Sequence, residues 1–339
     1  MPERATGGLA RAAALIAATY VYFLIFAEFA FLELARPVVG DGPRLRLVMG
    51  ALGVGGAAGS VLAARFFKRT EWGPRLAGWL LGCALAALAA LLSPTLGAVA
   101  LAAAGAAVGL ALGGATVTLA TGLAAVVPRG RLGLAAGLGT GMAYALCNLP
   151  WVFAATPAMQ TWLAVGAALL GAALAVCLPT ALAPSTITAR GGLGWTAVFL
   201  ALVWMDSAAF YIIQHTDALK AATWAGAWTL GGNAATHFVA AVLAGHALDR
   251  GRSGAVAAMA AGLLAVACLW IEHPRAELAY VAGVSLYSAA LVYLPARVGR
   301  PGFAAALFAI AGWGGSALGI GMAQDLRGVP AWFAFAAPV

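Results

Sequence analysis

Two carboxyl groups in the middle of long apolar segments are the residues with the clearest chemical potential. Glu28 follows Leu24-Ile-Phe-Ala, and Asp206 follows Leu202-Val-Trp-Met. An ionised side chain at the centre of a lipid bilayer costs at least about 2.5 kcal/mol. Removal from water favours the neutral form of a carboxyl group, which can then take up and release a proton. Glu28, Asp206 and also Glu33 are therefore candidates for reversible proton binding. In the alternative interpretation Glu33 lies at the outer interface, and Glu28 or Asp206 is a neutral acid that is hydrogen-bonded to a neighbouring helix.

A second group of polar and aromatic side chains lies deep in other apolar segments. Such residues can hold a partly apolar solute by stacking and hydrogen bonds. Equally, Trp and Tyr anchor the ends of membrane segments, and a buried Asn can tie two helices together. The candidates for a binding cavity are Asn148, Asn233, His237, Tyr287 and Trp228, accompanied by Tyr144, Trp151, Trp224, Tyr280 and Ser288.

Metal-binding and nucleophilic residue types form no motif. The four cysteines occur singly in apolar segments, at Cys83, Cys147, Cys177 and Cys268. This distribution indicates neither a disulfide framework nor a metal pair. Of the four histidines only His237 lies well inside an apolar segment, and a bis-histidine haem needs two. A metal importer would require Met205, His237 and Met322 to converge. We predict no enzyme, no cofactor and no resident metal.

The composition identifies the solvent around these segments as lipid. The 339 residues are 63% hydrophobic and 9% charged, and the mean hydropathy is +0.95. A soluble globule of this length cannot bury so much apolar surface. Long apolar runs without alternation exclude a β-barrel, so the predicted fold class is an all-α polytopic membrane protein. The net charge of +8 comes from residues in loops, which favours a topological role over nucleic-acid binding.

The apolar segments predict eleven spanning helices. Their expected ranges are 10–35, 46–67, 74–93, 97–127, 132–156, 160–182, 193–214, 222–247, 254–271, 276–296 and 302–323. A polar stretch at 183–192 is the expected linker between an amino-terminal six-helix bundle, 1–182, and a carboxyl-terminal bundle, 193–339. After Pro330 nine residues follow, reaching about 14 Å as a helix, so we expect a twelfth helix to be truncated or absent.

Two basic turns occupy matching places in the two halves. The second runs Gly245-His-Ala-Leu-Asp249-Arg250-Gly251-Arg252, and the first runs from Gly59 through Arg65 to Lys68 and Arg69. The pattern Gly-x-x-x-Asp-Arg-x-x-x-Gly after the second helix of a six-helix unit resembles the signature loop of the major facilitator superfamily of secondary transporters. The second turn matches it well. The first departs from it, with Ala64 in place of the acid.

This resemblance implies a fold and a mode of action. Two bundles related by a pseudo-twofold axis would rock about a central site, and the first, fourth, seventh and tenth helices would line it. Glu28 and Asp206 would then face the cavity from opposite halves and couple proton movement to a small solute, with symport the expected form. Asp249, with Arg250 and Arg252, would hold the cytoplasmic side closed against a neighbouring helix end. Ala64 implies a weaker latch in the first half.

The distribution of basic residues predicts the orientation. With the amino terminus inside, 13 of the 19 Lys and Arg residues fall in inner segments, and the remaining 6 fall outside. The inner set is Arg4, Arg11, Arg65, Lys68, Arg69, Arg75, Arg129, Arg131, Arg190, Arg250, Arg252, Arg297 and Arg300. The positive-inside rule therefore places both basic turns in the cytoplasm, and we expect residence in the inner membrane.

An alternative interpretation keeps the predicted fold but assigns no transport activity to the protein. The degenerate first turn and the short last segment also fit a scaffold or assembly subunit that packs against other membrane proteins. The discriminating observation would be whether a sealed polar cavity remains without the twelfth helix. The sequence names no solute class and no direction of movement.

Overall fold

In the part of the chain that is described, every regular secondary-structure element is a helix. The structure is a computed structural model that describes residues 2–128, 130–178, 192–273, 276–326 and 328–336. The long elements are α1 (Pro2–Val21), η1 (Tyr22–Ala30), α2 (Phe31–Val39), α3 (Pro43–Arg65), α4 (Trp72–Leu92), α5 (Ala98–Gly122), α6 (Leu132–Cys147), α8 (Pro157–Val176), α9 (Gly192–His215), α11 (Ala227–Asp249), α12 (Ser253–Leu269), α13 (Ala276–Val298), α14 (Pro301–Ala306), η5 (Leu307–Gly314) and α15 (Gly315–Leu326). The short ones are η2 (Arg69–Glu71), η3 (Ser93–Leu96), η4 (Leu123–Ala125), α7 (Pro150–Phe153), α10 (Asp217–Trp224) and α16 (Ala331–Ala336).

Two of the helical rods contain a π-helical segment. In the first rod α1 passes through η1 into α2, and in the last α14 passes through η5 into α15. Eight rods or helices within the described ranges are long and apolar enough to cross a membrane. Two shorter apolar helices, α6 and α12, and the 23-residue α11 bring the total within the described ranges to eleven. These correspond in order to the expected segments, while the number that crosses the bilayer stays a prediction.

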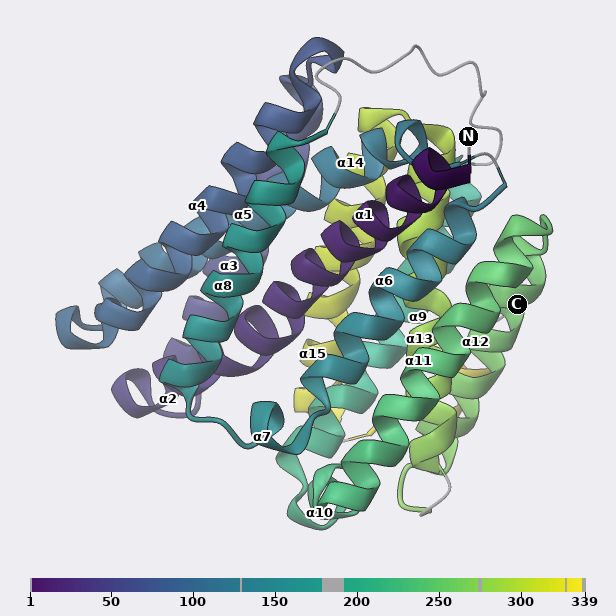
Figure 1. The fold of residues 1–339 in the computed structure, drawn as a ribbon. Helices are drawn as coiled ribbons and strands as arrows, with labels where there is room; N and C mark the ends of the chain where they lie inside the picture. Colours follow the sequence, from purple (N-terminus) through teal and green to yellow (C-terminus); the bar gives the residue numbers. More distant parts are fainter. Residues whose placement is uncertain (1, 129, 179–191, 274–275, 327, 337–339) are drawn as a thin grey trace.

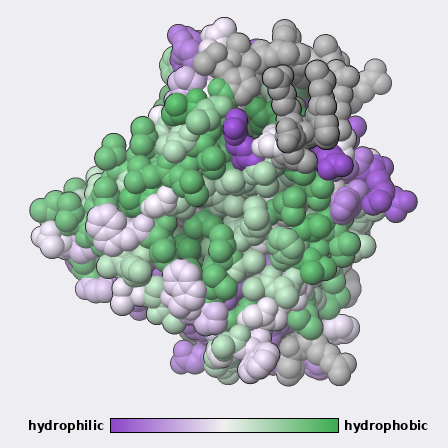
Figure 2. Space-filling model, in the orientation of Figure 1, coloured by the Kyte–Doolittle hydropathy of each residue, from purple (hydrophilic) through white to green (hydrophobic). Residues whose placement is uncertain are grey.

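The surface agrees with a lipid environment. Leu, Val, Trp and Phe side chains are widely exposed, including Val99 at 84% and Trp228 at 95%. On the face drawn in Figure 2 hydrophobic residues cover the middle, and hydrophilic ones gather towards the upper and lower margins. This protein is therefore an integral membrane protein.

Two predicted segment boundaries are wrong, for local reasons. The helix expected over 132–156 ends at Cys147, because Pro150 begins a separate turn and Asn148 caps the preceding helix through Nδ2 and the Tyr144 carbonyl, at 2.9 Å. The helix expected over 222–247 begins at Ala227, because Gly226 has a positive φ of 87° and separates α11 from α10. The expected linker, 183–192, lies outside the described residues except for Gly192.

Close backbone approach at glycine holds the helices together. A Cβ atom built on Gly109 of α5 would overlap the Leu52 carbonyl and the Gly56 amide of α3. Gly133 and Gly245 contact each other's backbone where α6 meets α11. Small residues are what such contacts require in lipid, where hydrophobic association adds little between helices.

Replacing one of these glycines tests the packing directly. We expect Gly109→Ala to destabilise the protein by about 1–3 kcal/mol, because the methyl group must displace the backbone of α3. Gly78→Ala is the matched control, since Gly78 is exposed on α4 and no atom lies within 4 Å of its Cβ position. Thermal unfolding in detergent should show a lowered midpoint for Gly109→Ala alone. Equal midpoints would contradict the tight contact.

Candidate functional site

The two candidate acids come together where the two halves of the chain meet. Glu28 lies on η1 and Asp206 on α9, and each is largely enclosed. They are near enough for their charges to act on one another. The tyrosines around them are Tyr20, Tyr144, Tyr280 and Tyr287. One acid comes from each half of the chain, and their role in a shared site stays a prediction.

The Asp206 carboxylate is only partly satisfied by hydrogen bonds. Tyr287, about two turns after Tyr280 along α13, donates its hydroxyl to Oδ2 of Asp206. The Tyr280 hydroxyl lies near the same carboxyl group. Oδ1 of Asp206 is buried and has no hydrogen-bond partner among the described residues. An acceptor in this state is costly to leave unpaired, so it is available to a proton or to a bound donor.

A second polar cluster connects the halves beside the acids. Nδ1 of His237 on α11 lies 2.7 Å from Oγ of Ser285 on α13, and the His237 ring stacks on Tyr144 of α6 at 4.3 Å and 9°. The Tyr144 hydroxyl lies 3.0 Å from Oγ of Ser288, whose carbonyl accepts a 3.4 Å bond from Tyr20. α1 and α6 of the first half are thus bonded to α13 of the second.

Other predicted cavity residues have different surroundings. Asn148 caps α6 as described, and Asn233 is 1% exposed and donates Nδ2 to the Thr223 carbonyl at 2.8 Å. Trp228 does not join the cluster: it lies in the first turn of α11 and is 95% exposed. Glu33 forms an ion pair with Arg36 at 2.7 Å, which matches its expected interfacial place.

Sequence reasoning overlooked Tyr20 and Ser285. Tyr20 stands eight residues before Glu28, which on an α-helix leaves the two side chains about 80° apart. Ser285 stands two residues before Tyr287 and could not be ranked among the many small residues of that segment. The spacing along the chain therefore did not identify either residue.

One end of the molecule, which we call the basic end, carries both basic turns and two contacts between the halves. Asp249 at the end of α11 accepts the backbone N–H of Gly133 at 2.6 Å and of Leu134 at 2.9 Å. A carboxylate at the start of α6 also opposes the positive end of the helix dipole. In the first turn, a guanidinium nitrogen of Arg69 donates to the Gly299 carbonyl at 3.3 Å. Each turn thus reaches the other half of the chain.

The predicted partners of Asp249 need one correction. Among the described residues Asp249 forms no ion pair, and its partners are the backbone amides of α6. Arg250 and Arg252 are exposed, because Gly251, with a positive φ of 76°, turns the chain away from α6. In the first turn Arg65 is exposed and Lys68 pairs with Glu71 at 3.3 Å. Gly59 packs against the backbone of Leu110 on α5.

The opposite end, which we call the aromatic end, is joined by four rings. Phe29 of η1 and Phe153 of α7 belong to the first half, whereas Phe210 of α9 and Trp224 of α10 belong to the second. Phe29 lies 5.5 Å from Phe210 and 6.2 Å from Trp224, and Trp224 lies 5.6 Å from Phe210 and 6.1 Å from Phe153. Figure 1 shows α2, α7 and α10 together on the lower side of the molecule, opposite the amino terminus.

This arrangement of helices has known counterparts. The Escherichia coli fucose:proton symporter FucP superposes with a TM-score of 0.66 at 14% identity, over 97% of this chain and 94% of that one. The chain has the fold of the major facilitator superfamily. A bacterial homologue of the iron transporter ferroportin matches with a TM-score of 0.65 at 12% identity, over 99% of this chain and 96% of that one. The human organic anion transporter MFSD10 matches with a TM-score of 0.63 at 14% identity, over 99% and 96% respectively.

The similarity is one of structure alone. No protein-family model and no curated protein matches the sequence. The three superfamily structures are named for a sugar, a metal and an organic anion. These comparisons therefore show the fold of the chain and indicate no solute.

Proposed function

We propose that this protein is a secondary active transporter that moves a small solute by alternating access, coupled to protons through Glu28 and Asp206. The observation that carries the proposal is the enclosed pair of carboxyl groups, one from each half, at the contact between the halves. Contacts between the same halves occur at the basic end and at the aromatic end. A transporter needs these three features, because each end must open in turn around a site that both halves share.

The proposed proton sites have tyrosine and cysteine neighbours. The described side chains near the two acids include Tyr20, Tyr144, Tyr280, Tyr287, Cys147 and Cys268, and His237 is stacked on Tyr144. Tyrosine donates hydrogen bonds to a carboxylate without supplying a positive charge. The proton occupancy of the acids can therefore respond to which end of the site is open to water, as symport requires.

The proposal also includes the orientation of the protein in the membrane and its division into units. The basic end carries Arg65, Lys68, Arg69, Arg250 and Arg252, which supports a cytoplasmic position for it and for the amino terminus. We place the protein in the inner membrane and divide it into the amino-terminal unit 1–182, the linker 183–192 and the carboxyl-terminal unit 193–339. Small solutes, protons and lipid are the proposed partners.

The test is solute-driven proton movement in proteoliposomes. Vesicles loaded with a pH-sensitive dye receive gradients of sugars, organic acids, amines and divalent metals in turn. We expect one class to move protons and to accumulate, and Glu28→Gln combined with Asp206→Asn to lower the coupled rate at least tenfold, since both proton sites are lost. Glu33→Gln is the control, because it removes a neighbouring acid that pairs with Arg36 instead.

Two results would count against the proposal. Unchanged concentrative uptake and pH dependence in the double variant would refute coupling through these acids. Absence of movement for every solute class, with a chain that is stable only beside other membrane subunits, would favour the scaffold reading.

A further inference from the structure

The charge balance around Asp206 restricts what the central site can bind. η1, α6, α9 and α11, which supply Glu28, Tyr144, Asp206 and His237, contain no lysine or arginine. α13 contains one, Arg297, in its last turn. Within the described ranges, no lysine or arginine forms an ion pair with Glu28 or Asp206. A bound anion would find no counter-charge here and two acids beside it.

We propose that the solute is an organic cation carrying a protonated amine, held by Asp206, Tyr280 and Tyr287. This assignment rests on the proposed transport function and names its substrate class. Oδ1 of Asp206 is the acceptor for one ammonium N–H, because it is buried and has no partner in the described part of the chain. Oδ2 is fixed in place by the Tyr287 hydroxyl. Asp206 is ionised while the amine is bound, so in that state Glu28 carries the coupled proton, and Asp206 can bind a proton when the amine is absent.

The surrounding rings suit the same ligand. Tyrosine faces attract cations within about 6 Å, and a desolvated contact of this kind contributes more than an exposed one. Tyr20, Tyr144, Tyr280 and Tyr287 all lie close to the two acids. Tyrosine hydroxyl oxygens also accept ammonium hydrogen bonds. A divalent metal fits less well, because the described residues contain no cluster of three His, Cys, Asp or Glu side chains.

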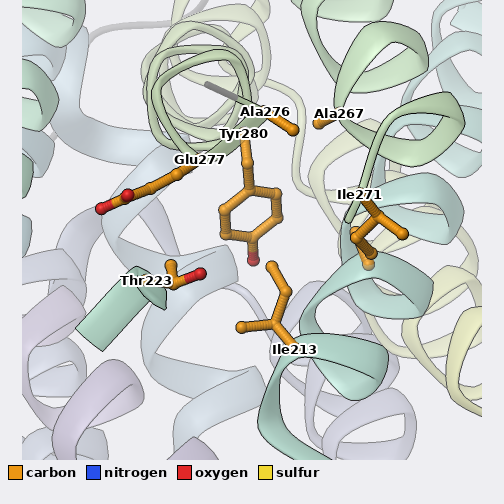
Figure 3. A pocket seen from close by; sticks show the side chains of 8 residues that line it. Ile213, Thr223, Ala267, Ile271, Ala276, Glu277 and Tyr280 are labelled. Atoms are coloured by element: carbon orange, nitrogen blue, oxygen red, sulfur yellow. The ribbon is translucent and has the colours of Figure 1, made fainter. Parts of the chain in front are cut away.

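A cavity at the aromatic end lies next to one of the tyrosines of this site. Its space of about 140 Å³ is lined by Leu219, Thr223, Ile271, Glu272, His273 and Glu277, among others. A smaller pocket shares Thr223, Ile271 and Glu277 with it and is also lined by Tyr280. Figure 3 shows the Tyr280 ring in this smaller pocket, with its hydroxyl near Ile213 and Thr223 and with Glu277 beside it. Two carboxyl groups and one histidine thus lie in the cavity that adjoins the pocket of Tyr280.

The experiment is equilibrium binding to the purified full-length protein with probes that differ only in charge. One matched set is tyramine, 4-ethylphenol and 4-hydroxyphenylacetate, which carry an ammonium, no charge and a carboxylate on one skeleton. Benzylamine, choline and tetraethylammonium, each with a neutral and an anionic analogue, extend the set, and Mn²⁺ alone represents divalent metals. Binding is measured as ligand-induced thermal stabilisation over a concentration series.

We expect saturable binding of ammonium probes only. Asp206→Asn should weaken it about thirtyfold, the equivalent of losing one charge-assisted hydrogen bond. Tyr287→Phe should reduce the preference of the ammonium probe over its neutral analogue while leaving the neutral analogue unaffected. Glu33→Gln should bind like the unmodified protein, and unchanged elution on size exclusion shows that each variant is folded.

The contrary outcomes separate this inference from the transport proposal. Tighter binding of the neutral or anionic analogues, binding of Mn²⁺ alone, or no saturable ammonium binding overturns the cation site, while solute-driven proton movement with another class would still support transport. Ammonium binding that is unchanged in Asp206→Asn also overturns it. Ammonium binding without proton movement would support the cation site and would contradict proton-coupled transport.

Discussion

Asp249→Ala is expected to open the basic end of the protein. The substitution removes both acceptors of the Gly133 and Leu134 amides and leaves the start of α6 without its capping carboxylate. Hydrogen bonds to a charged group each contribute about 1.5–3 kcal/mol. A loss of roughly 3 kcal/mol would favour the open form more than a hundredfold. Asp249→Asn retains one acceptor oxygen and should give an intermediate shift.

Spin labels across the basic end measure this change. Arg131→Cys on the first half and Gly254→Cys on the second are exposed positions on either side of the contact. Cys147 and Cys177 are replaced by alanine so that only the new sites react. Glu71→Ala is the control, since the partners of Glu71, Lys68 and Arg75, lie in its own segment. An unchanged label distance in Asp249→Ala would show that glycine packing alone holds this end closed.

Trp224→Ala is expected to open the aromatic end. The substitution removes ring contacts with Phe29, Phe153 and Phe210, two of which cross between the halves. Aromatic pairs contribute about 0.5–1.5 kcal/mol each beyond burial, so the closed form loses roughly 2–4 kcal/mol. This corresponds to a shift of about thirtyfold or more in the ratio of open to closed molecules.

The matching control is Trp228→Ala. The residue type and the truncation are the same as in Trp224→Ala, but Trp228 is 95% exposed and has no part in the ring cluster. Labels at Ala154→Cys and Ala218→Cys report the distance across the aromatic end. In an alternating-access protein Trp224→Ala should lengthen this distance and should not lengthen the one at the basic end. Lengthening at both ends would indicate general loosening instead of a gate.

The helices and their order could be predicted from the sequence because lipid leaves few alternatives. Each long apolar run had to become a helix, and the basic turns gave the superfamily resemblance. The breaks at Asn148-Leu-Pro150 and at Gly226 were harder to predict. One proline and one glycine end a helix only where tertiary contacts replace the lost backbone bonds, and those contacts are not local in sequence.

The sequence indicates which acidic residues belong to the candidate site, but it does not indicate the hydrogen bonds that they form. Glu28 and Asp206 could be identified because a carboxyl group in an apolar run is unusual. The bond from Tyr287 to Asp206 joins residues 81 apart, and the stack of Tyr144 on His237 joins two halves of the chain. Trp228 failed as a prediction because a tryptophan in an apolar segment faces lipid as readily as a cavity.

The π-helical segment that carries Glu28 gives the first rod a means of rotation. A π-helical turn holds one residue more than an α-helical turn. If η1 relaxed to α-helical bonding, the residues on one side of it would rotate about 100° relative to those on the other, since one residue occupies that angle. Glu28 and Phe29 both lie within Tyr22–Ala30. A change of hydrogen-bond register in this one segment would therefore turn Glu28 and the Phe29 ring of the aromatic end together, without any rigid-body movement of the bundle.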